Sequence, residues 1–126
     1  MALCIVVEDH RDTREGYVEY IGLSGFSVLS AGSADELRRL LTLQLPDVIV
    51  MDLQLPGTDG WDLIREIKKD ARTGQIPVLV VSGWVRNVDR EDAFTAGADG
   101  FVGKPCLPTE IVEELRKLVK RPVRHG

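Results

Sequence analysis

Several features that define whole classes of protein are absent from this sequence, or nearly so. Only two cysteines occur among the 126 residues, Cys4 and Cys106, and they show neither a metal-ligand spacing nor a disulfide framework. No apolar run approaches the roughly 18 residues that a membrane-spanning helix needs, and no basic-then-apolar signal segment opens the chain. The net charge of −4 argues against a nucleic-acid-binding surface. We expect a cytoplasmic protein that contacts neither membrane nor nucleic acid directly.

The composition that remains is that of one ordinary globular domain. Apolar residues make up 44% of the chain and charged residues 29%, and 126 residues can bury one substantial core but not two. We expect this domain to span residues 1–121 and a short tail to follow over residues 122–126. The basic cluster within residues 117–124 is typical of a helix end, whose dipole the cations complement.

Short runs of apolar, mostly β-branched residues alternate with longer segments of helical period. This alternation indicates an α/β fold in three layers, a doubly wound (βα)5 sandwich whose parallel five-stranded sheet has the order 2-1-3-4-5. The expected strands cover residues 3–7, 26–31, 48–51, 78–81 and 100–102. The first expected helix covers residues 12–24. The second begins after its cap, Ser33, and ends at Leu45-Pro46. The other three cover residues 59–71, residues 88–96 and a segment that begins at residue 108.

Residues with useful chemistry stand where four of these strands end. Glu8-Asp9 follow the first strand, Asp52 the third, Ser82 the fourth and Lys104 the fifth. Parallel strands place their carboxyl ends at one edge of the sheet, where open α/β proteins bind their ligands. The strand order puts the topological switch point between the first and third strands, so Glu8 and Asp9 should face Asp52 across one crevice.

Three carboxylates in one crevice call for a cation. Crowded acids raise one another's pKa unless positive charge lies among them, and carboxylate oxygens without a nearby thiolate favour Mg²⁺ over Zn²⁺. Mg²⁺ with carboxylates, a hydroxyl and an ammonium can support phosphoryl transfer, since the metal and Lys104 would neutralise phosphoryl oxygens while one carboxylate attacks. His10 adjoins the acids, but we expect it to lie in a loop or at a helix start rather than to bind the metal.

Together these motifs resemble the receiver domain of the response regulators of two-component signal transduction. The resemblance is carried by Glu8-Asp9, by Asp52 with the following segment Leu53-Gln54-Leu55-Pro56-Gly57-Thr58-Asp59-Gly60-Trp61, by Ser82-Gly83 and by Lys104-Pro105. It covers residues 3–121, nearly the whole chain, and implies a flavodoxin-like fold. Each motif alone is weak, and their order at matching strand ends makes the set specific.

The resemblance also implies a role for each acid. Asp52 would be the phosphoacceptor, which takes a phosphoryl group from the phosphohistidine of a partner and becomes an acyl phosphate. Glu8, Asp9 and Asp52 would bind Mg²⁺, together with the backbone carbonyl of Gln54. A receiver promotes its own phosphorylation and dephosphorylation, so we do not expect a conventional enzyme.

A switch is implied as well. Ser82 and Lys104 would bind phosphoryl oxygens, and the peptide between Lys104 and Pro105 would be cis. Phe101 matches the aromatic that moves inward when the hydroxyl is drawn to the phosphoryl group, although a plain core aromatic is the alternative, because Phe lacks the hydroxyl of Tyr. We also expect the large Trp84 to limit the approach of water to the acyl phosphate.

Partners follow from these roles. The donor would be a sensor histidine kinase or a phosphotransfer protein. A downstream protein or a second copy of the chain would read the face formed by the helix over residues 88–96, the strand over residues 100–102 and the last helix, once phosphorylation shifts the population of its conformations. The alternative is a receiver-like interaction module that phosphorylation does not regulate.

Other classes that use similar folds or nucleophiles fit these residues less well. An FMN carrier would need a hydroxyl-rich first loop, whereas Glu8-Asp9-His10 would repel a phosphate. A dehalogenase-type phosphatase would need a second acid two residues after its nucleophile, where Gln54 stands. A dinucleotide-binding domain would need a Gly-rich turn after the first strand, and none is present.

Overall fold

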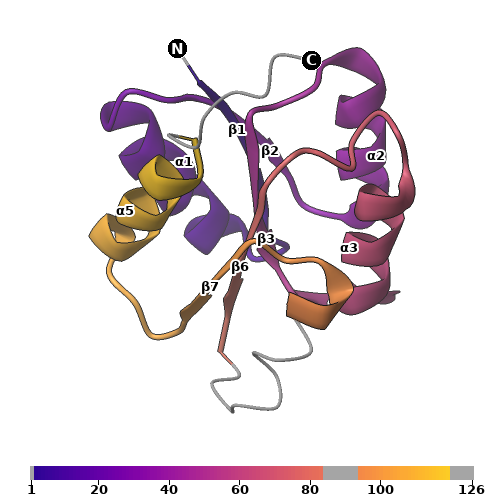
Figure 1. Ribbon diagram of the computed structural model, residues 1–126. Coiled ribbons are helices and arrows are strands. Elements are labelled where there is room, and N and C mark those ends of the chain that lie inside the picture. Colours follow the sequence, from indigo (N-terminus) through magenta and orange to yellow (C-terminus); the bar gives the residue numbers. More distant parts are fainter. Residues whose placement is uncertain (1, 84–93, 120–126) are drawn as a thin grey trace.

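The computed structural model describes residues 2–83 and 94–119, and Figure 1 shows the arrangement of their elements. One parallel sheet has the strand order β2-β1-β3-β6-β7. Its strands are β1 (Leu3–Val7), β2 (Ser27–Ala31), β3 (Val48–Asp52), β6 (Val78–Ser82) and β7 (Gly100–Gly103). Numbered along the chain, this is the order 2-1-3-4-5, so the predicted fold class is confirmed.

Helices cover both faces of the sheet and make the three predicted layers (Figure 1). On one side lie α1 (Arg11–Leu23) and α5 (Pro108–Val119), and on the other lie α2 (Ala34–Leu43) and α3 (Gly60–Lys69). Among the helices of the described residues, none has both the length and the apolar character needed to cross a membrane.

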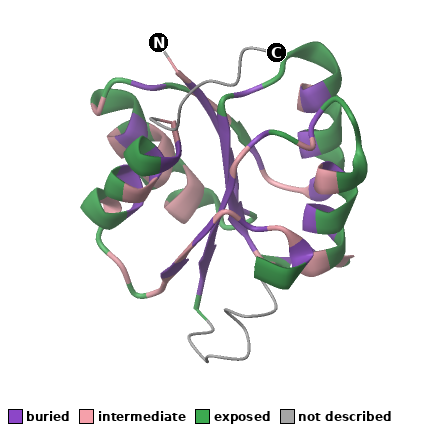
Figure 2. Cartoon of the chain, viewed as in Figure 1, coloured by how far each residue is buried: buried purple, intermediate pink, exposed green. Residues whose placement is uncertain are grey.

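Side chains alternate between the two faces along each strand. Ile5 and Val7 belong to the core on the α2 and α3 side, whereas Cys4 and Val6 belong to the core on the α1 and α5 side. As Figure 2 shows, β1, β3 and β6 are buried along their whole length. A parallel sheet covered on both faces explains why these strands appear in the sequence as continuous apolar runs.

Side-chain caps stand at the start of α1 and of α2, and the cap of α2 is the predicted Ser33. Ser33 accepts a hydrogen bond from the backbone N of Glu36 at 3.2 Å and so caps α2. The Nδ1 of His10 accepts one from the backbone N of Thr13 at 3.3 Å, which confirms that His10 lies at a helix start. Such caps satisfy backbone donors that have no partner within the helix.

Two segments differ from the predicted elements or lie outside the description. A short antiparallel ladder of β4 (Gln54–Leu55) and β5 (Thr58–Asp59) follows Asp52, where the sequence predicted no strand. It closes at Gly57, whose φ of 69° suits glycine in a tight turn. The helix predicted over residues 88–96 lies mostly outside the described residues, as do Trp84 and the tail; residues 94–96 are helical.

One ion pair joins α3 to the amino ends of β6 and β7. Lys68 Nζ donates to Asp99 Oδ2 at 2.8 Å and to the carbonyl of Ile76 at 2.7 Å. The same Asp99 oxygen accepts from the backbone N of Val78 at 2.9 Å. Because Asp99 precedes β7 and Val78 begins β6, this contact fixes the amino ends of both strands.

We predict that Asp99→Ala lowers the free energy of unfolding by about 1–3 kcal/mol, because it removes the counter-charge of the partly buried Lys68 ammonium and the acceptor of the Val78 backbone N–H. Urea unfolding followed by circular dichroism measures this. Asp62→Ala is the control, since the Asp62 pair with Arg65 is 72% and 49% exposed and should contribute less than about 1 kcal/mol. Equal losses in the two variants would contradict the prediction.

Candidate functional site

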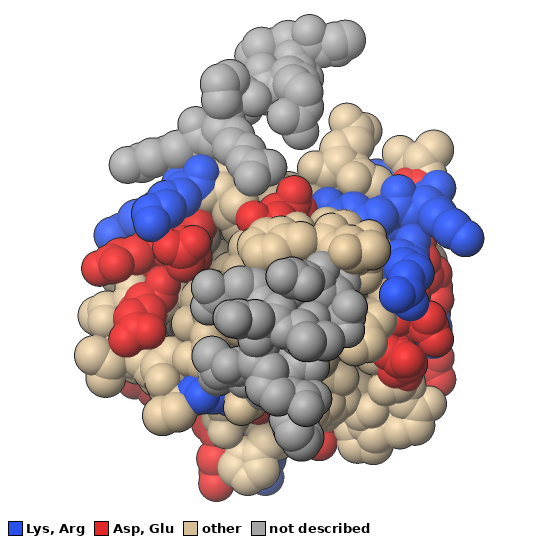
Figure 3. All heavy atoms as spheres, turned by 60° about the horizontal axis from the view of Figure 1, so that its bottom comes forward, with Lys and Arg blue, Asp and Glu red and all other residues tan. Residues whose placement is uncertain are grey.

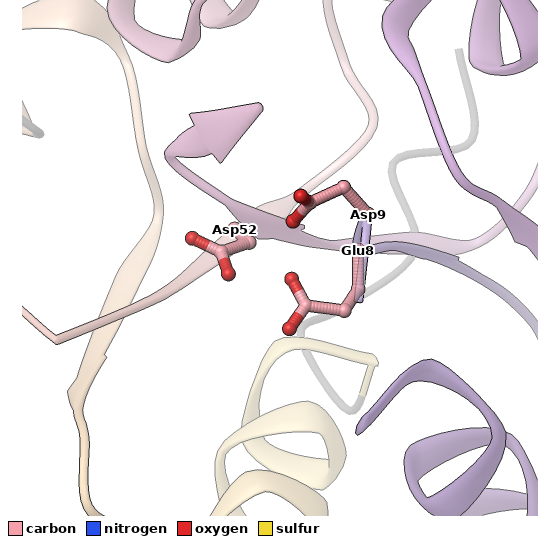
Figure 4. A group of neighbouring side chains, drawn as sticks. All are labelled: Glu8, Asp9 and Asp52. Carbon is pink, nitrogen blue, oxygen red and sulfur yellow. The ribbon is translucent and has the colours of Figure 1, made fainter. Parts of the chain in front are cut away.

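The acids that the sequence places at strand ends meet in space. Glu8 and Asp9 follow β1, and Asp52 ends the neighbouring strand β3, with Val7 paired to Met51 in the register. One carboxylate oxygen from each acid lies within 4.8 Å of the other two. Figure 4 shows the three side chains converging on one space. Glu8 and Asp52 are buried, whereas Asp9 is exposed, so the cluster opens to water on the Asp9 side.

Lys104 reaches the acids from the loop after β7. Its Nζ lies 3.0 Å from Asp52 Oδ2 and 3.4 Å from Glu8 Oε1. Its backbone N donates to the carbonyl of Ser82 at 2.7 Å, because β6 and β7 are paired up to this point. Ser82 is fully buried at the end of β6. The peptide between Lys104 and Pro105 is cis, as the resemblance implied.

The loop after Asp52 is held close to the carboxylate. Asp52 Oδ1 accepts a hydrogen bond from the backbone N of Gln54 at 2.9 Å. The start of α3 packs directly on this loop, since a Cβ on Gly60 would lie 2.7 Å from the carbonyl oxygen of Leu53. Only glycine permits such an approach, so Gly60 fixes the position of the segment that bears Gln54.

The charges in the crevice separate two similar acids into different protonation states. Burial raises the pKa of Glu8 to about 8, and the neighbouring Asp52 carboxylate adds to the rise against the opposing effect of Lys104. Burial alone would also raise the pKa of Asp52, but Glu8, the backbone N–H of Gln54 and Lys104 together lower it. At neutral pH, without a metal ion, Asp52 is therefore the ionised acid, as a nucleophile must be.

The donor atoms suit a hard divalent cation. Glu8 Oε2 is buried and has no hydrogen-bond partner among the residues that the structure describes. Buried polar atoms are normally paired, so an unpaired carboxylate oxygen beside two further carboxylates is what a cation site requires. The oxygens of Glu8, Asp9 and Asp52 fit Mg²⁺, which prefers carboxylates and carbonyls to sulfur.

The structure gives the position of Phe101 and adds Arg14 to the residues around the predicted site. Phe101 on β7 is partly buried, and its side chain packs against the core on the α2 and α3 side of the sheet. Arg14 on α1 was not predicted, yet its guanidinium donates to the carbonyls of Glu8 and Asp9. A contact between a side chain and a loop backbone leaves no periodic signal in a sequence.

Comparison with known proteins identifies the family. Residues 4–116 match the response regulator receiver domain, and the chain therefore belongs to this family. Among solved structures it is similar to the signal receiver domain of a signal transduction histidine kinase from Syntrophus aciditrophicus (25% identical, TM-score 0.90, covering 100% of this chain and 96% of that one). It is also similar to the non-phosphorylated HemR receiver domain from Leptospira biflexa (25% identical, TM-score 0.89, covering 100% of both chains).

Similar curated proteins include two from Pseudomonas aeruginosa. The transcriptional regulatory protein AruR is 33% identical over 127 residues, which cover 97% of this chain and 50% of AruR. The phosphate regulon transcriptional regulatory protein PhoB is 28% identical, with 93% of this chain and 51% of PhoB covered. The chain thus spans about half the length of these curated relatives. It is a signalling module rather than a conventional enzyme.

We predict that Gly60→Ala lowers the free energy of unfolding by about 1–3 kcal/mol, because the added methyl group would overlap the backbone of Leu53. Gly16→Ala is the matched control on α1, where a Cβ meets nothing within 4 Å, and it should stabilise the protein by about 0.5–1 kcal/mol. Thermal and urea unfolding of both variants measure the changes. Stabilisation by Gly60→Ala would show that the loop can move aside freely.

The two thiols should differ in reactivity. Burial raises the pKa of Cys4 to about 12 and also raises that of the partly exposed Cys106. At pH 8, iodoacetamide should modify Cys106 slowly, with a rate that rises about tenfold per pH unit as the thiolate fraction rises, and should modify Cys4 only in unfolded protein. Timed quenching with peptide mass measurement tests this, and rapid labelling of Cys4 in native protein would contradict it.

Proposed function

We propose that this chain is a phosphorylation-dependent receiver whose phosphoacceptor is Asp52. The observation that carries the proposal is the contact of the ionised Asp52 carboxylate with Lys104 Nζ at 3.0 Å, beside an acidic pair with an unpaired buried oxygen. The phosphoryl donor is the phosphohistidine of a sensor histidine kinase or of a phosphotransfer protein.

The proposed transfer exchanges one bond for another. An oxygen of Asp52 attacks the phosphorus, the phosphorus–nitrogen bond of the phosphohistidine breaks, and the imidazole nitrogen keeps the electron pair. Glu8, Asp9 and Asp52, with the backbone carbonyl of Gln54, would hold Mg²⁺. When bound, Mg²⁺ supplies positive charge that offsets the phosphoryl oxygens.

Lys104 and Ser82 complete the proposed binding site for the phosphoryl group. The ammonium of Lys104 already lies at the carboxylate and can follow the negative charge onto a phosphoryl oxygen. Sheet geometry supports coupling of Ser82 to Phe101. Val80 pairs with Phe101 in the register, and Ser82, two residues after Val80, projects to the same face of the sheet. Movement of Ser82 toward the phosphoryl group would free space on that face for Phe101.

A downstream protein or a second copy of the chain would read the face that residues 94–96, β7 and α5 form. A groove of about 280 Å³ lies between β7 and α5 and is lined in part by Phe101, Glu110, Glu113 and Glu114. Figure 3 shows acidic side chains, with basic ones beside them, on the side of the molecule where α1 and α5 lie. A protein that binds this groove would therefore need basic groups opposite the glutamates.

Acetyl phosphate tests the phosphoacceptor directly. Incubation with Mg²⁺ and acetyl phosphate, followed by intact-mass measurement, should give a single phosphate adduct that EDTA prevents. Asp52→Asn should abolish the adduct, because the amide is a poor nucleophile, and Asp12→Asn, an exposed acid of α1, should retain it. An adduct that persists in Asp52→Asn would refute the proposal by placing the phosphoacceptor elsewhere. An adduct that never forms in the wild type would refute it and favour an interaction module that phosphorylation does not regulate.

A further inference from the structure

Arg14 lies on the first turn of α1 and folds back over the loop that carries the acidic pair. Its Nη1 donates to the carbonyl of Glu8 at 2.9 Å and to the carbonyl of Asp9 at 3.4 Å. Its backbone N donates to the carbonyl of His10 at 2.9 Å. One residue of the helix therefore contacts three consecutive carbonyl groups of the loop.

These contacts fix the peptide planes on both sides of the Asp9 Cα. The carbonyl of Glu8 lies in the plane that joins Glu8 to Asp9, and the carbonyl of Asp9 lies in the next plane. Because each peptide unit is planar, holding both oxygens toward one guanidinium sets the backbone dihedrals that aim the Asp9 side chain. The sheet holds the loop from its other end, where the backbone N of Glu8 donates to the carbonyl of Ala31 at 3.0 Å.

Gly32 provides the space in which the guanidinium lies. A Cβ at this position would be 2.8 Å from Arg14 Nη1 and 3.6 Å from its Cζ. Gly32 does not have a positive φ, unlike Gly25, Gly57 and Gly97, so its backbone conformation alone does not call for glycine. The absence of a side chain at Gly32 is explained by the room that Arg14 needs.

We propose that Arg14 is a positioning residue for the divalent cation, which fixes the loop so that Glu8 and Asp9 are aimed before the ion arrives. The inference rests on the proposed function of Glu8, Asp9 and Asp52 as the Mg²⁺ site. It predicts that removal of Arg14 weakens Mg²⁺ binding, whereas simple electrostatics predicts that the removal strengthens it. By charge alone, a guanidinium near the site repels Mg²⁺, and its removal would strengthen binding. Loss of positioning weakens binding instead.

The test is the Mg²⁺ affinity of the unphosphorylated full chain, followed by the shift of the Gln54 amide signal in nuclear magnetic resonance spectra during titration with MgCl₂. Arg14→Gln should raise the half-saturating Mg²⁺ concentration about three- to tenfold. This is less than the roughly 10- to 100-fold cost of losing a partner bonded to the metal ligand itself, because Arg14 holds the backbone of the loop rather than the carboxylates. Gly32→Ala should do the same without any change of charge, because the added methyl group displaces the guanidinium.

Arg11→Gln is the matched control. It removes the same charge from the same turn of α1, but the Arg11 guanidinium bonds the Glu15 side chain and is 78% exposed. Its half-saturating Mg²⁺ concentration should stay within about twofold of the wild type. Arg14→Lys keeps the charge but replaces the planar guanidinium, whose Nη1 bonds both carbonyls, with a compact ammonium on a shorter side chain, and it should weaken Mg²⁺ binding as well.

The outcomes separate the two proposals. If the wild type binds Mg²⁺ and both Arg14→Gln and Gly32→Ala bind it equally or more tightly, the proposed role of Arg14 is overturned and the proposed metal site stands. A wild type that shows no response to Mg²⁺ would overturn both. Phosphorylation by acetyl phosphate at saturating Mg²⁺ should proceed in both variants within about twofold of the wild-type rate, whereas a general loss of structure would lower it at every Mg²⁺ concentration. Gly32→Ala decides the matter if Arg14→Gln does not fold.

Discussion

The attraction between the Lys104 ammonium and the Asp52 carboxylate holds together a site that its other charges would drive apart. Three carboxylates converge there, and two of them, Glu8 and Asp52, are 2% and 7% exposed. Lys104 contacts both of these acids. It acts with Glu8 and the backbone N–H of Gln54 to lower the pKa of Asp52, whereas burial raises the pKa of Glu8 against the opposing effect of Lys104. The rest of the architecture can be understood as the means of bringing residues that are 52 and 96 positions apart in the chain to this one contact.

That convergence depends on rigid strands and on loops with little freedom. Strands β1 and β3 are buried on both faces, so the points at which the chain leaves the sheet are fixed. Beyond those points, close packing takes over from sheet hydrogen bonding. Gly60 lets α3 press on the loop after Asp52, and Gly32 lets Arg14 hold the loop after β1. The close packing that these two glycines permit thus fixes the loops, just as hydrogen bonding between strands fixes the sheet.

The fold and the acidic cluster could be predicted because both leave periodic or positional marks in the sequence. Strands covered on both faces are continuous apolar runs, and polar residues directly after such runs must lie at the carboxyl edge. The ladder of β4 and β5 could not be predicted, since two residues per strand are too few to show a period. Arg14 and Lys68 could not be assigned either, because their partners are mostly backbone carbonyls and an acid far along the chain. Ordinary basic residues on a helix look the same whether they face water or hold a loop.

The bond network around Asp99 has a mechanical consequence for the opposite edge of the sheet. Lys68, Asp99 and the backbone of Val78 fasten β6 and β7 to α3 at the ends where these strands begin. Ser82 and Lys104 stand at or just beyond the other ends. The contact around Asp99 therefore fixes the amino ends of both strands, and none of its bonds reaches their carboxyl ends. Any displacement that phosphorylation caused at Ser82 and Lys104 would then be taken up between the two ends, in the part of β7 that carries Phe101.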